Sequence, residues 1–427
     1  MMPAIRSLHI GFLHPDLGLG GAERLVIDAA LHLQAVGHRV TMFTAHHDSA
    51  RCFEETRNGT LDVRVYGDFL PSHVGRRLRA PYAMARMAYL TGAMALYGDR
   101  YDVVFCDLVA HTMPLLKWFS QAKILFYCHF PDQLLAPRRH WLYRLYRAPI
   151  DRLEALGTGM ADRVLVNSRF TAAIFRQTFP HLRAMLLEVL YPGVDCARYA
   201  SCAAAHGPAP GQDSAGDARE VLILSINRYE RKKTLGLVVE ALALLRERLS
   251  SAVFASLRLV MAGGYDDRLQ ENRDTFLDLQ ALVQHHRLAG HVIFMRSCTE
   301  SERLALLARC RCVVYTPANE HFGFVPLEAM AAGRPVVAAD SGGPLETVRR
   351  EYTGLLCPPT PQAFAEALAR LIANPGMAER MGQAGRLHVA QHFSLAAFGT
   401  RLEAIIQELV APDAGHDCAP LEHRAPL

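Results

Sequence analysis

Two glutamates in the last third of the chain are well placed by type and spacing to bind a polar ligand. Glu320 and Glu328 flank a turn that contains Gly323 and Pro326, in a largely apolar segment that continues into a helix-forming stretch. Glutamate is rarely buried unless it is paired or hydrogen-bonded, so two in one short apolar segment indicate a ligand. One carboxylate could hold the hydroxyls of a sugar and the other the ribose diol of a nucleotide. The alternative is a strand end followed by a helix, with Glu328 in the first turn favoured by the helix dipole.

A basic cluster at residues 225–233 follows an apolar run that is typical of a strand. Arg228 offers a planar guanidinium with several donors, and Lys233 offers a mobile ammonium. Two such cations suit a diphosphate leaving group, because its departure builds negative charge that must be stabilised. The alternative is a solvated basic loop that precedes a helix.

Glycines stand between the first apolar run and the first expected helix. Gly20 and Gly21 are adjacent there, and a residue without Cβ lets the backbone approach a ligand closely. A helix N-terminus favours negative charge, so these two glycines are candidate phosphate contacts. The spacing is not that of the dinucleotide-binding fingerprint, no P-loop lysine follows, and a simple tight turn is the alternative. A second glycine turn at residues 340–346 could likewise bind an anion or merely cap a helix.

His129 follows an apolar run at residues 124–128. At the end of a strand, its imidazole could hydrogen-bond a sugar hydroxyl or a phosphate oxygen. A lone histidine can also be purely structural, and both interpretations stay open.

Alternation of short apolar runs with amphipathic stretches predicts an α/β fold. Strands without polar interruptions, separated by helices, indicate parallel sheets covered on both faces, in the doubly wound manner. The expected strands are 8–13, 39–44, 102–106, 124–128, 164–166, 221–226, 257–262, 291–295, 311–315 and 335–339. The expected helices are 22–35, 235–249, 360–372 and 395–410.

The pattern stops and restarts, which predicts two domains. Residues 1–200 form the first, and 201–219 are a linker or insertion because Ala, Gly, Pro, Ser and Asp dominate there. Residues 220–394 form the second, and the helix of residues 395–411 is expected to cross back to the first. Ligands of such sheets bind outside the strand C-termini, so the cleft between the domains is the expected site.

Composition excludes several classes of protein. The chain has 427 residues, 51% hydrophobic and 21% charged, which suits two globular domains and not a disordered chain. A net charge of +4 argues against a general nucleic-acid binder. The ten cysteines lack metal-ligand spacing, and Cys310 and Cys312 are expected on one face of a strand as buried free thiols, typical of a reducing compartment. The sequence shows no cluster of acidic residues that would bind a metal ion.

Residues 82–97 form the longest apolar stretch, rich in Ala and Met and interrupted by Arg86. It is shorter than a spanning helix needs, and no cleavable signal peptide is evident. A packed core helix is the main interpretation. The alternative is a helix on a membrane surface, with the basic residues 76–79 meeting anionic lipid.

The joint pattern resembles the retaining glycosyltransferases of family 4, which have the GT-B fold of two Rossmann-like domains facing a central cleft. The likeness spans roughly residues 8–410. Within that family, several segments of the sequence are similar to those of the α-1,3/1,6-mannosyltransferases of dolichol-linked oligosaccharide assembly. The matching segments are residues 14–18, 20–23, 126–132, 145–151, 193–195, 225–233, 319–323 and Glu328.

This resemblance implies GDP-mannose as donor, a dolichyl-diphosphate-linked Man-GlcNAc2 acceptor, and the cytosolic face of the endoplasmic reticulum membrane. It also makes the membrane surface and other transferases of the pathway expected partners, with no catalytic metal or other cofactor. The roles that it implies for particular residues are as follows: Arg228 and Lys233 hold the diphosphate, Glu328 the ribose and Glu320 the transferred sugar, His129 lies by that sugar, and Gly20 and Gly21 meet the phosphates.

The implied reaction adds an α-1,3 and then an α-1,6 mannose with retention of configuration. The leaving diphosphate would itself help to deprotonate the acceptor hydroxyl. Three alternatives remain: a family-4 transferase with another nucleotide sugar or acceptor, a non-catalytic GT-B scaffold, and a GT-B epimerase or phosphorylase.

Overall fold

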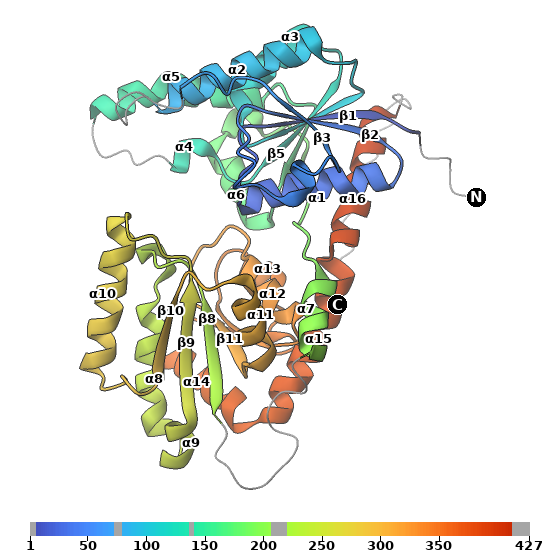
Figure 1. Cartoon of the computed structure of the whole chain (residues 1–427). Helices are drawn as coiled ribbons and strands as arrows, with labels where there is room; N and C mark the ends of the chain where they lie inside the picture. The colour runs from blue at the N-terminus through green and yellow to red at the C-terminus, as the bar shows by residue number, and fades with distance from the viewer. Residues whose placement is uncertain (1–5, 72–78, 136–140, 206–219, 412–427) are drawn as a thin grey trace.

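Two parallel sheets organise the protein into two lobes (Figure 1). The computed structural model describes residues 6–71, 79–135, 141–205 and 220–411. The first sheet has the order β3-β2-β1-β4-β5-β6-β7 and the second the order β10-β9-β8-β11-β12-β13, all with parallel pairing. The expected α/β class, with two doubly wound Rossmann-like domains of the GT-B kind, is therefore confirmed.

The first sheet is built from strands of apolar residues that are buried almost throughout, as parallel sheets require. Helices cover both faces of the sheet, which separates two apolar cores. The strands are β1 (His9–His14), β2 (Arg39–Thr44), β3 (Asp62–Val65), β4 (Val103–Asp107), β5 (Lys123–Cys128), β6 (Arg163–Val166) and β7 (Leu187–Val189). The helices are α1 (Gly21–Ala35), α2 (Arg79–Tyr97), α3 (Met113–Phe119), α4 (Asp132–Leu135), α5 (Trp141–Thr158) and α6 (Arg169–Thr178).

The second sheet repeats this plan, and the five strands and two helices that were expected within residues 220–394 begin and end within a few residues of the expected positions. The strands are β8 (Val221–Ile226), β9 (Leu257–Gly263), β10 (Val292–Arg296), β11 (Cys312–Tyr315), β12 (Val336–Ala339) and β13 (Gly354–Cys357). The helices are α8 (Gly236–Arg248), α9 (Ser251–Ser256), α10 (Gln270–His285), α11 (Glu300–Arg309), α12 (Phe324–Ala331), α13 (Pro344–Thr347), α14 (Pro361–Ala373) and α15 (Pro375–His392).

Two helices tie the lobes together. α7 (Cys196–Ala205) contacts α11 and α12 of the second domain, so the predicted boundary at residue 200 falls inside an element of that domain. α16 (Leu395–Val410) runs back along the first domain and packs against α1, where Glu403 lies 2.7 Å from the buried His38 (Figure 1). Most of the predicted linker, residues 206–219, lies outside the described residues.

α2 is a packed helix, as the main interpretation of residues 82–97 held. Met87, Leu90 and Met94 recur at helical spacing and are buried against the first sheet. The apolar face is therefore occupied by the protein core. Of the basic flank, residues 76–78 lie outside the described residues.

The expectation for Cys310 and Cys312 is wrong in one respect. Cys310 follows the end of α11 and only Cys312 lies in β11, so the two buried thiols join different apolar cores instead of one face. The thiols of Cys310 and Cys312 are free, as are those of Cys52, Cys106, Cys128, Cys196, Cys298 and Cys357.

Candidate functional site

The candidate side chains gather where the two sheets present their strand C-termini. In the first sheet β1 lies beside β4, and in the second β8 lies beside β11. At both places the strand order reverses, which is where ligands bind in doubly wound sheets. His14 and Asp107 end β1 and β4, and His129 follows β5 directly.

Asp107 is completely buried and lies between two histidines. Its Oδ2 is 3.0 Å from His14 Nδ1, and its Oδ1 is 2.9 Å from His129 Nε2. These are ion-pair separations, although the ring N–H directions fall short of ideal hydrogen-bond geometry. The Asp107 carboxylate thus positions the His129 ring. The side chain of Asn167 also donates to the backbone carbonyl of His129 at 3.1 Å.

His14 carries charge inside the protein. Burial alone would lower the pKa of His14, but Asp107 and Glu23 outweigh burial and raise that pKa to about 9. Burial would likewise raise the pKa of Asp107, yet His129 and His14 hold it below its ordinary value. His14 and Asp107 were missed by the sequence reasoning about catalysis, although both end apolar strands.

The glycine loop at Gly20 and Gly21 is connected to the His14–Asp107–His129 cluster through Glu23. Gly20 precedes α1 in an extended conformation, and a Cβ on it would lie 2.1 Å from Oε2 of Glu23, so a side chain there would displace that carboxylate. Glu23 in turn lies 3.9 Å from His14 Nε2. Gly21 has open space around it and lines the cavity described below, as a backbone contact to a ligand requires.

Lys233 and Glu320 are brought together in the second domain. Lys233 Nζ lies 2.5 Å from Glu320 Oε2, and both side chains are largely buried. Burial would raise the pKa of Glu320, but the hydrogen bond and charge of Lys233 hold it below its usual value. The backbone of Lys233 is fixed as well, because Thr316 donates to its carbonyl at 2.7 Å.

Arg228 lies apart from this pair. Its side chain is 68% exposed and its Nη1 is 3.1 Å from Glu230. Of the two cations predicted to hold the diphosphate, Lys233 is therefore buried and Arg228 is exposed. A ligand would have to draw Arg228 away from Glu230.

Glu328 is not in the first turn of its helix. It is the fifth residue of α12, which begins at Phe324, so the helix-dipole interpretation is wrong. Its carboxylate is instead paired with Arg303 of α11, at 2.8 and 2.7 Å from the same guanidinium nitrogen.

Loops of the two domains meet directly beside these groups. The rings of Phe130 and His321 stack at 3.8 Å with an interplanar angle of 7°, and Ser168 donates to the carbonyl of His321 at 2.5 Å. Burial is the main cause that lowers the pKa of His321. Glu320 opposes this effect, and the charges of Lys232 and Lys233 lower the pKa further.

The second glycine turn closes the same interface. Gly343 donates its N–H to the carbonyl of Glu320 at 2.8 Å, so the turn shapes the Glu320 loop. Glu346 beyond it accepts from the backbone N–H groups of Arg169 and Phe170, both at 2.8 Å. These N–H groups begin α6 of the other domain, so the carboxylate caps that helix across the cleft.

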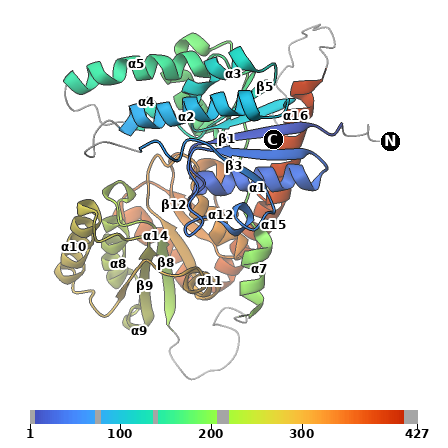
Figure 2. The same ribbon diagram turned by 45° about the horizontal axis from the view of Figure 1, so that its top comes forward.

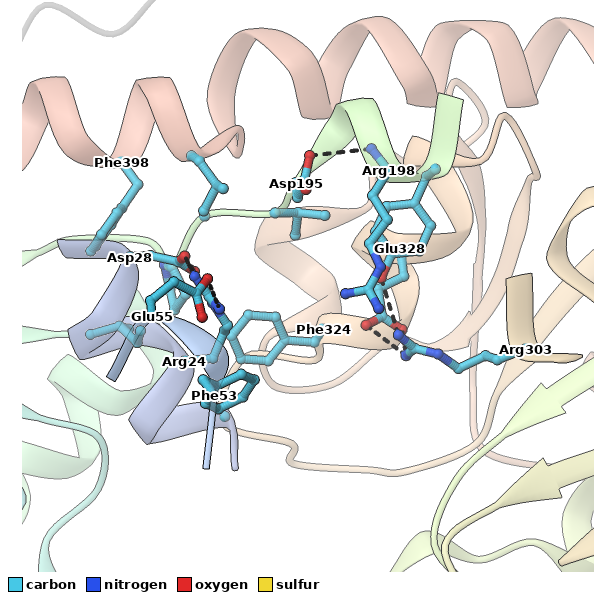
Figure 3. A pocket seen from close by; sticks show the side chains of 17 residues that line it. Arg24, Asp28, Phe53, Glu55, Asp195, Arg198, Arg303, Phe324, Glu328 and Phe398 are labelled. Carbon is cyan, nitrogen blue, oxygen red and sulfur yellow. Dashed lines mark hydrogen bonds and ion pairs between the residues drawn. The ribbon is translucent and has the colours of Figure 1, made fainter. Parts of the chain in front are cut away.

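A cavity of about 690 Å³ opens between the domains, of a size that suits a small-molecule ligand (Figure 3). One wall is α1, with Gly21, Arg24 and Asp28, and the opposite wall holds Arg303 and Glu328. The described parts of the chain contain no group of three or more His, Cys, Asp or Glu side chains placed to hold a metal ion.

Comparisons with known proteins agree with this geometry. Residues 212–388 match the model of "Glycosyl transferases group 1", and residues 19–198 match that of "Glycosyltransferase Family 4". The chain is 47% identical to the α-1,3/1,6-mannosyltransferase ALG2 of Homo sapiens over 93% of this chain and 95% of the human protein. It is 38% identical to the protein of the same name from Saccharomyces cerevisiae, over 94% of this chain and 85% of the yeast protein.

Solved structures resemble the fold at low sequence identity. Sucrose-phosphate synthase from Thermosynechococcus elongatus superposes with a TM-score of 0.74 at 23% identity, covering 95% of this chain and all of that one. A glycosyltransferase from Rickettsia africae gives a TM-score of 0.70 at 19% identity, covering 95% of this chain and 99% of that one.

Proposed function

The chain belongs to the α-1,3/1,6-mannosyltransferases, and we propose on that premise that it transfers mannose from GDP-mannose to a dolichyl-diphosphate-linked Man-GlcNAc2 core. It is a glycosyltransferase that acts in the assembly of the N-glycan precursor. The sequence alternatives of a scaffold, an epimerase and a phosphorylase are disfavoured by this membership.

One observation carries the proposal for the site: His129 and the Lys233–Glu320 pair belong to different domains, yet the neighbouring rings of Phe130 and His321 stack at 3.8 Å and join their loops. A nucleotide sugar in the cleft would place its diphosphate near Lys233 and Arg228, with the backbone at Gly20 and Gly21 opposite. Glu328 would take the ribose. The transferred mannose would lie between Glu320 and His129.

The proposed mechanism needs no protein nucleophile, no metal and no other cofactor. The sugar–phosphate bond breaks while Lys233 and Arg228 stabilise the charge that builds on the diphosphate. A diphosphate oxygen takes the proton of the acceptor hydroxyl, which attacks on the face that the diphosphate leaves. Configuration at the anomeric carbon is thereby retained.

A transfer assay tests donor and acceptor together. Purified protein is incubated with GDP-mannose and a synthetic lipid-diphosphate Man-GlcNAc2, and the product is weighed by mass spectrometry. A gain of two hexoses supports the proposal in full, and one hexose means that only one linkage is made. No product, with GDP-mannose still bound, contradicts the proposed acceptor and favours another family-4 reaction.

We propose that the enzyme acts at the cytosolic face of the endoplasmic reticulum membrane, and the surface of the first domain supports contact with a lipid-linked acceptor. Among the described residues, no helix has the length and apolar character to cross a bilayer. Large apolar side chains are nevertheless exposed on α3 and α5, which lie on the side of the first domain away from the second (Figures 1 and 2). They include Trp118, at 82% exposure, and Trp141, at 72%. Tryptophan is favoured at membrane interfaces, where its ring is apolar and its N–H remains hydrated.

We expect the double variant Trp141→Ser with Leu145→Ser to bind liposomes several-fold more weakly, because each substitution removes apolar area from the proposed contact. Flotation with vesicles of phosphatidylcholine and phosphatidylserine measures this. Leu387→Ser is the matched control, since Leu387 is 63% exposed on α15 of the second domain. Equal binding of the double variant and the control would contradict a membrane contact at α5.

A further inference from the structure

The Glu328 carboxylate is held by an arginine on a neighbouring helix. Nη1 of Arg303 donates to both carboxylate oxygens, at 2.8 and 2.7 Å. The two side chains are 20% and 13% exposed, and both line the cavity between the domains (Figure 3). The contact therefore lies where a ligand enters, not in the closed core.

Further hydrogen bonds fix the guanidinium of Arg303. Its Nη2 donates to Glu300 at 3.0 Å and to the hydroxyl of Tyr199 at 3.3 Å. Tyr199 is buried on α7, the helix that follows the crossing between the domains. A guanidinium is planar and always charged, so contacts on several sides leave it little freedom to turn.

The arrangement leaves acceptor capacity on Glu328. An ionised carboxylate has about four lone-pair sites, and Arg303 takes one on each oxygen. A vicinal diol presents two O–H donors, which two carboxylate oxygens in a fixed orientation can accept together. Without Arg303, the Glu328 carboxylate would be free to rotate.

We propose that Arg303 is a positioning residue for the nucleotide, which fixes Glu328 so that both carboxylate oxygens accept from the ribose diol. Tyr199 limits the rotation of the Arg303 guanidinium. This inference rests on the proposed function, in which Glu328 holds the ribose. The competing explanation is a purely structural ion pair that joins α11 to α12.

Nucleotides without the diol separate the two explanations. Calorimetry measures the binding of GDP and of 2′,3′-dideoxy-GDP to the wild type and to Arg303→Gln. We expect Arg303→Gln to weaken GDP roughly tenfold to a hundredfold, the loss of one charge-assisted hydrogen bond. The affinity for dideoxy-GDP should change by less than about twofold. An equal loss for both nucleotides, or no loss for GDP, overturns the proposal.

Two further variants guard against a simple folding defect. Tyr199→Phe removes only the hydroxyl, so it should weaken GDP in the same direction by a smaller factor and leave dideoxy-GDP unchanged. Arg309→Gln removes an exposed arginine from the last turn of the same helix and should change neither nucleotide. If Arg303→Gln does not fold, the Tyr199→Phe result decides, and equal effects on both nucleotides overturn the proposal.

Failure of this inference is distinguishable from failure of the proposed function. The nucleotide cycle needs no acceptor, whereas mannosyl transfer does. A wild type that distinguishes the two nucleotides but transfers no mannose leaves Arg303 in its role and contradicts the acceptor. A wild type that transfers mannose but binds both nucleotides equally overturns the role of Arg303.

Discussion

We expect Lys233→Ala to lower kcat for mannose transfer by on the order of 100-fold or more, because it removes the buried cation that we propose faces the leaving diphosphate. Charge that develops on the diphosphate in the transition state then meets only Arg228, which is exposed and paired with Glu230. Steady-state kinetics with GDP-mannose and the lipid acceptor in detergent measure the effect. Near wild-type turnover would contradict the assignment.

Stability must be separated from catalysis in this variant. Glu320 would lose the cation that lies 2.5 Å away, so its pKa would rise and part of the activity loss could come from the altered carboxylate. Lys117→Ala is a matched control, since Lys117 Nζ lies 2.6 Å from Asp162 on the outer side of the first domain. The control should keep kcat within a few-fold. Unfolding curves of both variants show whether Lys233→Ala remains folded.

The local elements could be predicted from the sequence because each depends on neighbouring residues. Strands β2 and β8 begin and end as expected, and Gly20 and Gly21 do open a helix. Apolar runs of four to six residues between helices have few structural solutions other than a buried parallel sheet. Glu320 and Lys233 were predicted for one site from their motifs, and the structure places their charged ends in contact.

Contacts between distant segments could not be predicted in the same way. Asp107 reaches His14 and His129 only because β4 lies between β1 and β5 in the sheet, an order that the chain does not state locally. Arg303 sits in an ordinary amphipathic helix, and nothing in its neighbours indicates Glu328 as a partner. The short strands β3, β7 and β13 were also missed, since each has only three or four residues.

Asp107→Asn should lower the free energy of unfolding by about 3 to 5 kcal/mol near pH 6, because it leaves a buried imidazolium without its carboxylate. That is a large part of the 5–15 kcal/mol typical of a folded domain. The pKa of His14 is raised from 6.5 to about 9 in the folded protein. The contribution of the charged His14 to the free energy of unfolding is therefore complete below pH 6.5 and is lost as the pH rises through 9.

The size of this contribution follows from the pKa change. A shift from 6.5 to about 9 corresponds to about 3 kcal/mol. In the variant, His14 loses its main anionic neighbour. The unfolding free energy of the variant should therefore vary less with pH between 6.5 and 9. The gap between wild type and Asp107→Asn is thus expected to be widest near pH 6 and to narrow toward pH 9.

Denaturant unfolding at pH 6, 7.5 and 9 measures that gap. His285→Gln removes an exposed histidine of α10 and should shift all three values equally. A gap that stays constant with pH would show that Asp107 stabilises the fold by packing or hydrogen bonding alone. The charge on His14 would then have no part in holding His129 beside the cleft. A gap that narrows as expected would show that the site is kept in place by a buried charge pair, which any substrate-facing role of His129 depends on.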